Sequence, residues 1–166
     1  MNKALEQFEK YASANRLAVE PTKTQTMYST ATNHIKQMKS KGTRMNNITL
    51  RVSPEIKILG YWLDEQLTGI AHYSRATGKA IRAAGAVGRS SKFLPQKDRE
   101  FLVKSLSHPH LYYCQSSLYN PCGEANKYME RAYNRGARII CRTERSAPAL
   151  DRLGWLTWAD AQQRCQ

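Results

Sequence analysis

The spacing of the apolar residues changes near residue 68, and this change constrains the fold more than any other feature of the sequence. Before it, short runs with strand-like alternation are separated by turn residues, as at 48–52 and 56–63 with Pro54 between them. After it, apolar and small residues recur at helical spacing. The sequence therefore predicts an α+β chain, with a small antiparallel β part at residues 1–66 and an all-helical bundle at residues 67–166.

The first part is expected to hold one helix and two short hairpins. Residues 1–15 place Leu5, Phe8 and Ala12 on one side of a helix. The turn residues 21–23 lie between two short β-compatible runs, which predicts the first hairpin. The run 48–52 followed by a single strand at 56–63 predicts the second.

The second part is expected to hold three or four helices. Beyond Thr68, small and apolar residues from Tyr73 to Val87 form one helix face, and the opposite face is basic. Pro95 fits the first turn of the next helix, and Pro109 is expected to kink or restart it. That helix is predicted to turn these side chains inward: Phe101, Leu102, Ser105 and Leu106.

The helix predicted over residues 124–142 carries the sharpest charge pattern. At 100° per residue, six cations fall within about 80° of one another around the helix axis. The opposite side is apolar, so the helix buries one face and exposes the other. These six residues are called the basic stripe: Lys127, Arg131, Arg135, Arg138, Arg142 and Arg145. An ordinary solvated helix face is the alternative interpretation.

The overall charge favours a polyanionic partner. The chain has 26 Lys and Arg against 13 Asp and Glu, a formal net charge of +13. No stretch approaches the roughly 20 apolar residues that a membrane span requires, so no membrane partner is expected. Four cysteines without a CxxC pair favour reduced thiols inside the cell, which is compatible with a nuclear location or a cytoplasmic ribonucleoprotein.

Five strings occur in an order that resembles a known family. They are NRLAVEPTKTQTM from Asn15, ILGYWLD from Ile58, SHPHLYYC from Ser107, RAYNRGARIIC from Arg131, and RSAPAL followed by GWLTW from Arg145. Together they resemble the reverse transcriptases of non-LTR (LINE-type) retrotransposons, downstream of the catalytic centre. The resemblance covers nearly the whole chain. It implies the end of a palm at residues 1–66 and a helical thumb at residues 67–166.

The resemblance also implies roles for individual residues. Lys23 matches a lysine near the incoming triphosphate, although an ordinary exposed turn lysine is the simpler interpretation. Gly60, Tyr61 and Trp62 match the strand that grips the primer, and alternation along a strand would send the two aromatic rings to opposite faces, one of them into the core. The basic stripe, together with Arg75, Lys79 and Arg82, would contact the backbone of RNA, of an RNA/DNA hybrid or of a DNA duplex.

Polymerase chemistry requires carboxylates that the sequence lacks. Two aspartates on neighbouring strands hold the two Mg²⁺ ions of such an enzyme, and this chain has no Asp-Asp pair. In the family these residues lie upstream of the helix that opens here. We therefore expect no polymerase activity from the chain alone, no cofactor bound to it, and Mg²⁺ only in a complete polymerase, whose upstream part is a possible partner.

Two other interpretations account for parts of the sequence. His108, His110, Cys114 and Cys122 could be read as a zinc set, but their spacing is not that of a zinc knuckle, and packing is the favoured role. The chain could also be a stand-alone basic nucleic-acid-binding or ribonucleoprotein module, or an inert remnant of a truncated element.

Overall fold

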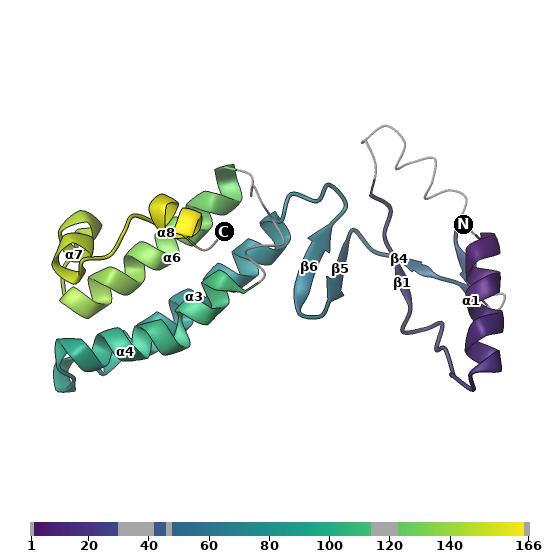
Figure 1. Ribbon diagram of the computed structural model, residues 1–166, viewed down its shortest axis with the longest axis horizontal. Coiled ribbons are helices and arrows are strands. Elements are labelled where there is room, and N and C mark those ends of the chain that lie inside the picture. The colour runs from purple at the N-terminus through teal and green to yellow at the C-terminus, as the bar shows by residue number, and fades with distance from the viewer. Residues whose placement is uncertain (1, 30–41, 46–47, 114–122, 165–166) are drawn as a thin grey trace. The chain divides into compact units, whose positions relative to one another are not determined.

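The computed structural model describes residues 2–29, 42–45, 48–113 and 123–164 (Figure 1). The fold is α+β, as predicted. The chain divides into two compact units, Met1–Leu67 and Thr68–Gln166.

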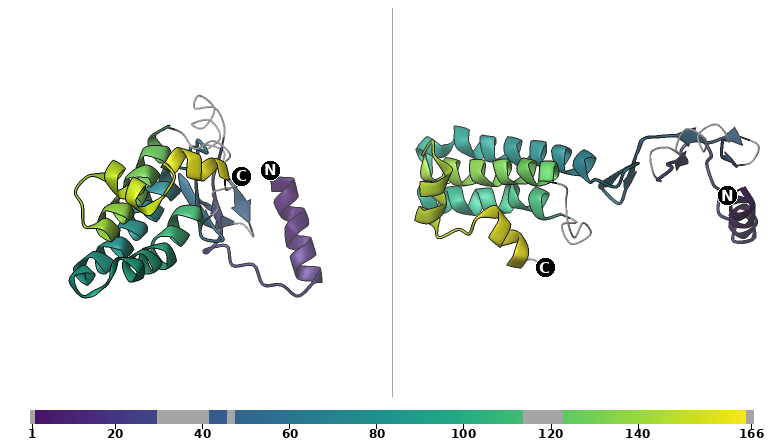
Figure 2. Two further views of the ribbon diagram at one scale, coloured as in Figure 1. Left: turned by 60° about the vertical axis from the view of Figure 1, so that its left-hand side comes forward. Right: turned by 90° about the horizontal axis from the view of Figure 1, so that it is seen from above.

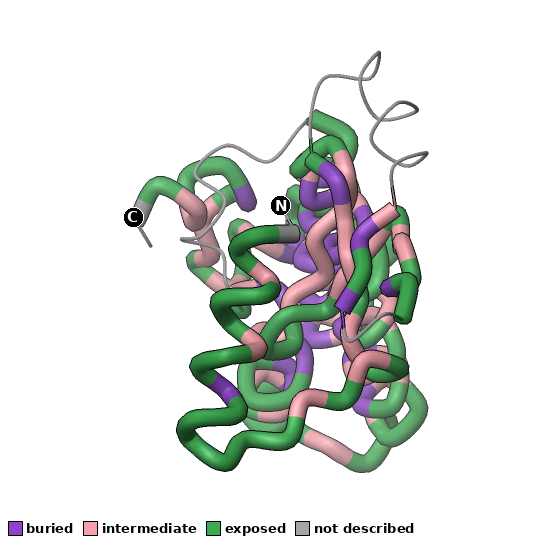
Figure 3. The backbone as a smooth tube through the Cα atoms, turned by 90° about the vertical axis from the view of Figure 1, so that its right-hand side faces the viewer, coloured by how far each residue is buried: buried purple, intermediate pink, exposed green. Residues whose placement is uncertain are grey.

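The first unit begins with α1 (Asn2–Ala14), which confirms the predicted helix. It ends where Arg16 takes a left-handed backbone conformation and Leu17 N donates to Ala12 O at 2.8 Å. Of residues 3–14 only Ala12 is buried, and Phe8 is 45 % exposed, so α1 is drawn mainly as exposed in Figure 3. The apolar side of α1 is therefore only weakly covered by the described part of the unit.

The strands of this unit are very short and pair differently from the prediction. β1 (Gln25–Thr26) pairs in parallel with β4 (Arg51–Val52), and β2 (Arg44–Met45) pairs antiparallel with β3 (Ile48–Thr49). The predicted hairpin around residues 21–23 is wrong. The turn itself forms, with Thr24 N donating to Pro21 O, but the residues before it are not a strand, and β1 takes its partner from farther along the chain.

The predicted single strand at 56–63 is in fact a hairpin. β5 (Glu55–Ile58) and β6 (Tyr61–Asp64) pair antiparallel, with Ile58 opposite Tyr61. The two residues between them, Leu59 and Gly60, have φ of 48° and 92°. Positive φ at both central positions is what a tight two-residue hairpin requires, and this explains Gly60 without a ligand.

The second unit is entirely helical within its described residues. It contains α3 (Ile70–Arg89), the short 3₁₀ turn η1 (Ser91–Phe93), α4 (Gln96–Leu106) and α5 (His108–Tyr112), then α6 (Gly123–Cys141), α7 (Ser146–Leu153) and α8 (Trp158–Arg164). These are six α-helices in the described ranges 68–113 and 123–164, more than the three or four predicted. The break between α4 and α5 confirms the restart at Pro109.

Helices α3, α4 and α6 pack side by side around the core of this unit (Figure 2). The small residues of α3 allow close packing, with Ala80 and Ala84 fully buried. Gly136 of α6 is needed where α4 approaches, because a Cβ there would lie 3.0 Å from Val103 Cγ1. A second cluster, around Tyr133 and Trp158, fills the space under α5 and α8.

The predicted inward face of α4 is wrong. Phe101 is 68 % exposed and Leu106 is 49 % exposed, and Ser105 is also exposed. The buried residues of α4 are Arg99 and Val103. Val103 fits against Gly136, and Arg99 hydrogen-bonds the end of α6, so the neighbouring helix decides which side of α4 is buried.

Candidate nucleic-acid interface

The basic stripe exists on α6 but is shorter than predicted. Lys127, Arg131 and Arg135 are exposed and Arg138 is half-buried. The opposite side of α6 is buried, and it includes Ala125, Met129, Ala132, Tyr133, Gly136, Ala137 and Ile140. The helix therefore presents four cations on the side that faces away from its core.

Arg142 and Arg145 do not belong to this helix face, which corrects the prediction. α6 ends at Cys141, Arg142 has a φ of 53°, and Arg145 caps the start of α7. The Arg142 side chain donates a hydrogen bond to Ser91 O in η1. A rotation of 100° per residue applies only while the chain is helical. Arg142 and Arg145 lie beyond the end of α6, so their predicted positions on this face are wrong.

A second basic row lies on α3. Arg75, Lys79 and Arg82 are exposed, as predicted from the helical wheel. Arg75 Nη1 donates to Ala71 O, one turn earlier, at 2.8 Å. The core-facing residues of the same helix, such as Ala80 and Ala84, are on its other side.

The contacts between α3, α4 and α6 show which of these helices run parallel and which run antiparallel. Thr77 of α3 meets Met129 of α6, and Gly88 of α3 meets Ile139, so α3 and α6 are parallel. Val103 of α4 meets Gly136, whereas Arg99, earlier in α4, bonds Ile140, so α4 is antiparallel to both.

This arrangement puts the two basic rows on one face. On α6, Ile139 faces α3. Around the helix axis, Arg135 lies about 40° to one side of Ile139, and Gly136, which faces α4, lies about 60° to the other side. On α3, Gly88 faces α6. Around the axis of α3, Arg82 lies about 120° from Gly88, on the side away from α4. Arg82 and Arg135 therefore lie on the side of the α3–α6 pair that α4 does not cover. We call the cations on this side the basic face: Arg75, Arg82, Arg131 and Arg135.

Three of the four cations on this face form no ion pair with a carboxylate of the described residues. These are Arg82, Arg131 and Arg135, and the same holds for Lys79 and Lys127. One ion pair within α4 joins Lys104 and Glu100, at 2.7 Å. Residues 68–166 contain 16 basic and 7 acidic residues, so the second unit is strongly positive.

The first unit brings Lys23 and Trp62 together. Both line a hollow of about 500 Å³, along with Gln25, Arg51, Ser53 and Lys57, among others. The pairing of β5 with β6 sets Lys57 opposite Trp62, and the pairing of β1 with β4 sets Gln25 opposite Arg51.

Sequence reasoning identified Lys23 and Trp62 separately but missed Arg51 and Lys57. Their alternation in short strands was the available signal. Gly60 and Tyr61 do not line this hollow. Tyr61 is half-buried like Trp62, so the structure distinguishes the two rings by position rather than by exposure.

The proposed zinc ligands do not form a described metal site. Within the described residues, no three His, Cys, Asp or Glu side chains are grouped as metal ligands. Cys114 and Cys122 lie outside the described residues. His108 stacks on Tyr133, with ring centroids 5.5 Å apart, and meets the edge of Trp155 at 5.1 Å, so it packs in an aromatic cluster.

Comparisons with protein-family models, with curated proteins and with solved structures found no significant match. None of the helices in the described ranges has the length and apolar character needed to cross a membrane.

Proposed function

We propose that this chain binds the phosphate backbone of a nucleic acid through the basic face. The observation that carries the proposal is that Arg82 of α3 and Arg131 and Arg135 of α6, which form no ion pair with a carboxylate of the described residues, share the side of the helix pair that α4 leaves open. Phosphate contacts of this kind position a protein on RNA or DNA without reading its sequence. Binding is therefore expected to be strong at low salt and tolerant of sequence.

The family resemblance supports a more specific version of this proposal. The order of the sequence motifs suggests the C-terminal palm and thumb of a non-LTR retrotransposon reverse transcriptase, which would act on a template–primer duplex in the nucleus or in a cytoplasmic ribonucleoprotein. In that role the chain would bind the template–primer duplex but would not catalyse polymerisation, because it lacks the paired aspartates that hold Mg²⁺. The hollow that holds Lys23 and Trp62 would then face the primer end.

The favoured alternative is a stand-alone basic module that binds nucleic acid in a ribonucleoprotein. An in-frame aromatic-Ala-Asp-Asp string encoded just upstream of Met1 would favour the polymerase, or a remnant of one, over this module. Binding by the basic face is common to the polymerase fragment and the module, whereas an inert remnant would lack it.

The double substitution Arg82→Gln with Arg131→Gln is expected to weaken duplex binding about tenfold at ~0.1 M salt, because each helix loses one phosphate contact. Fluorescence anisotropy with a labelled DNA duplex, an RNA/DNA hybrid and a single strand measures this. The matched control is Lys97→Gln with Arg152→Gln, two exposed cations on α4 and α7. Equal weakening by the two variants would show that only net charge matters, and would reject the basic face.

A further inference from the structure

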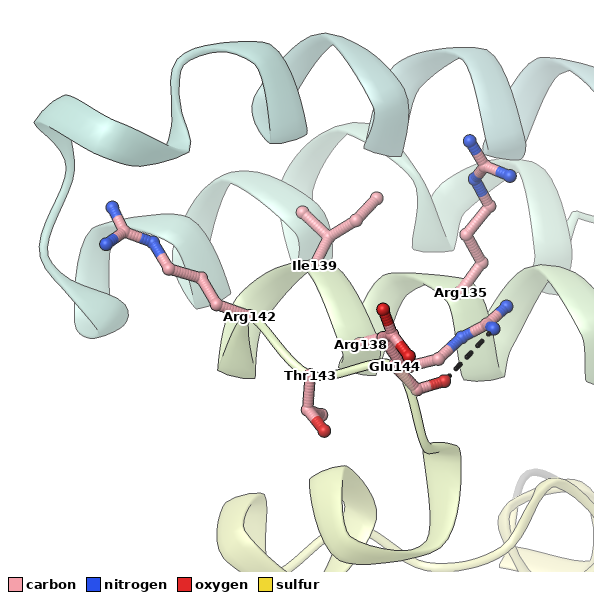
Figure 4. A pocket seen from close by; sticks show the side chains of 6 residues that line it. All are labelled: Arg135, Arg138, Ile139, Arg142, Thr143 and Glu144. Carbon is pink, nitrogen blue, oxygen red and sulfur yellow. Dashed lines mark hydrogen bonds between the residues drawn. The ribbon is translucent and has the colours of Figure 1, made fainter.

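A hollow of about 330 Å³ lies where α6 ends (Figure 4). It is lined by six residues: Arg135, Arg138, Ile139, Arg142, Thr143 and Glu144. Figure 4 shows the guanidinium groups of Arg135 and Arg138 on one side of Ile139 and that of Arg142 on the other. Three cations and one carboxylate therefore line one hollow, which makes it positively charged.

The backbone at the end of α6 builds this hollow. Arg142 takes a left-handed conformation, and Thr143 N donates to Arg138 O at 3.1 Å, which closes the helix. The chain then turns back, so that Glu144 O accepts a hydrogen bond from Arg138 Nη1 at 3.4 Å. Arg142 reaches the other way, to Ser91 O. The positions of Arg138 and Arg142 are therefore set by hydrogen bonds to the main chain.

Arg138 retains an unused donor. Its Nε is shielded from water and has no hydrogen-bond partner among the described residues. Only Nη1 donates, to Glu144 O, so the edge of the guanidinium formed by Nε and Nη2 is unoccupied within the described part of the chain. A buried donor without an acceptor is unfavourable. Nη2 is the amino group that remains for a phosphate oxygen, and a charged donor of this kind forms a strong hydrogen bond with a phosphate.

We propose that the hollow holds one internal phosphate of a bound nucleic-acid strand, bound by the guanidinium groups of Arg138 and Arg135. This inference rests on the proposed function and names a single anchoring point within it. Arg135 belongs to both the basic face and the hollow, so a strand that follows the face along α6 continues into the hollow. Glu144 lines the same hollow and opposes an anion there, which limits how tightly the phosphate is held.

Substitutions at Glu144 and Glu130 separate this site from general charge. Glu144→Gln and Glu130→Gln each remove one negative charge, but Glu130 is an exposed residue that does not line the hollow. We expect Glu144→Gln to tighten duplex binding about threefold to fivefold and Glu130→Gln to change it less than about 1.5-fold. Because only the main-chain carbonyl of Glu144 bonds Arg138, the substitution leaves that contact in place.

The substitution Arg138→Gln is expected to weaken duplex binding about tenfold or more, against about threefold for Arg131→Gln outside the hollow. Thermal melting followed by circular dichroism checks that each variant is folded. If Arg138→Gln unfolds the end of α6, the two glutamate variants still decide the question. Equal effects of Glu144→Gln and Glu130→Gln would overturn the proposal.

The Arg138 Nε–Hε signal in ¹H–¹⁵N spectra of the full chain gives a readout that does not depend on affinity. Titration with inorganic phosphate, and then with duplex, should shift this signal, and duplexes with and without a 5′-phosphate should act alike. A shift only with the 5′-phosphorylated duplex would overturn the assignment to an internal phosphate. A shift with inorganic phosphate in a chain that binds no nucleic acid would reject the proposed function but leave a phosphate site. Duplex binding without any shift would reject the site alone.

Discussion

Arg99→Met is expected to lower the free energy of unfolding of the helical unit by about 3 to 5 kcal/mol. Arg99 is 6 % exposed. Its Nε and Nη2 both donate to Ile140 O, at 2.9 and 2.6 Å, and its Nη1 donates to Leu94 O. One side chain therefore ties the start of α4 and the segment before it to the last turn of α6, where a cation also suits the helix dipole. Methionine would leave both carbonyls without these donors.

Urea unfolding of the full chain in a Trp62→Phe background measures this loss, because Trp155 and Trp158 then report on the helical unit alone. Lys97→Met, at an exposed position of the same helix, is the control and should change the stability by less than about 0.5 kcal/mol. A loss of under 1 kcal/mol for Arg99→Met would contradict the assigned role of this side chain.

Acid is expected to destabilise the helical unit through His108. Burial in the aromatic cluster, with a smaller effect of Lys104, lowers the pKa of His108 from 6.5 to about 4. The folded state therefore favours neutral His108, and its contribution is complete above pH 6.5 and is lost as the pH falls from 6.5 towards 4. The loss reaches about 3 kcal/mol at the acid end. His72, whose pKa is also lowered mainly by burial, acts in the same direction.

The substitution His108→Phe isolates this effect. It keeps a flat ring against Tyr133 and removes the titrating group, so the stability of the variant should depend less on pH between 6.5 and 4 than that of the wild type. Urea unfolding at intervals of half a pH unit provides the comparison. The pKa of Glu100 is lowered mainly by its hydrogen bond to Lys104, which both proteins keep, so this main contribution cancels in the difference. Parallel curves for the two proteins would contradict the role of His108.

The parts of the fold that the sequence predicted are those with a long repeating pattern. α3 and α6 each span about five turns, and on both the small and apolar residues return to one side often enough to identify the buried face. The strands of the first unit are two to four residues long. Such segments carry too little alternation to reveal a parallel pairing between Gln25 and Arg51, because that pairing depends on contacts far apart in the sequence.

The candidate site was predictable only within single helices. The four cations on α6 follow from its periodicity. The residue after the helix, Arg142, has a left-handed conformation, and a glycine at that position would have been a recognisable signal of the helix end. The common face of Arg82 and Arg131 depends on α3 and α6 running parallel. That direction is set by contacts such as Gly88 with Ile139, which no local pattern contains. The buried side of α4 depends in the same way on Gly136 and on the carbonyl of Ile140.

The salt dependence of duplex binding tests the basic face most directly. The slope of log K against log salt for the full chain should be about −0.9 for each phosphate contacted, so four contacts give a slope of roughly −4. Arg131→Gln with Arg135→Gln should make the slope shallower by about 2, whereas Lys97→Gln with Arg152→Gln should leave it unchanged. Absence of binding by the wild type at ~50 mM salt, or the same slope in both double variants, would contradict the account.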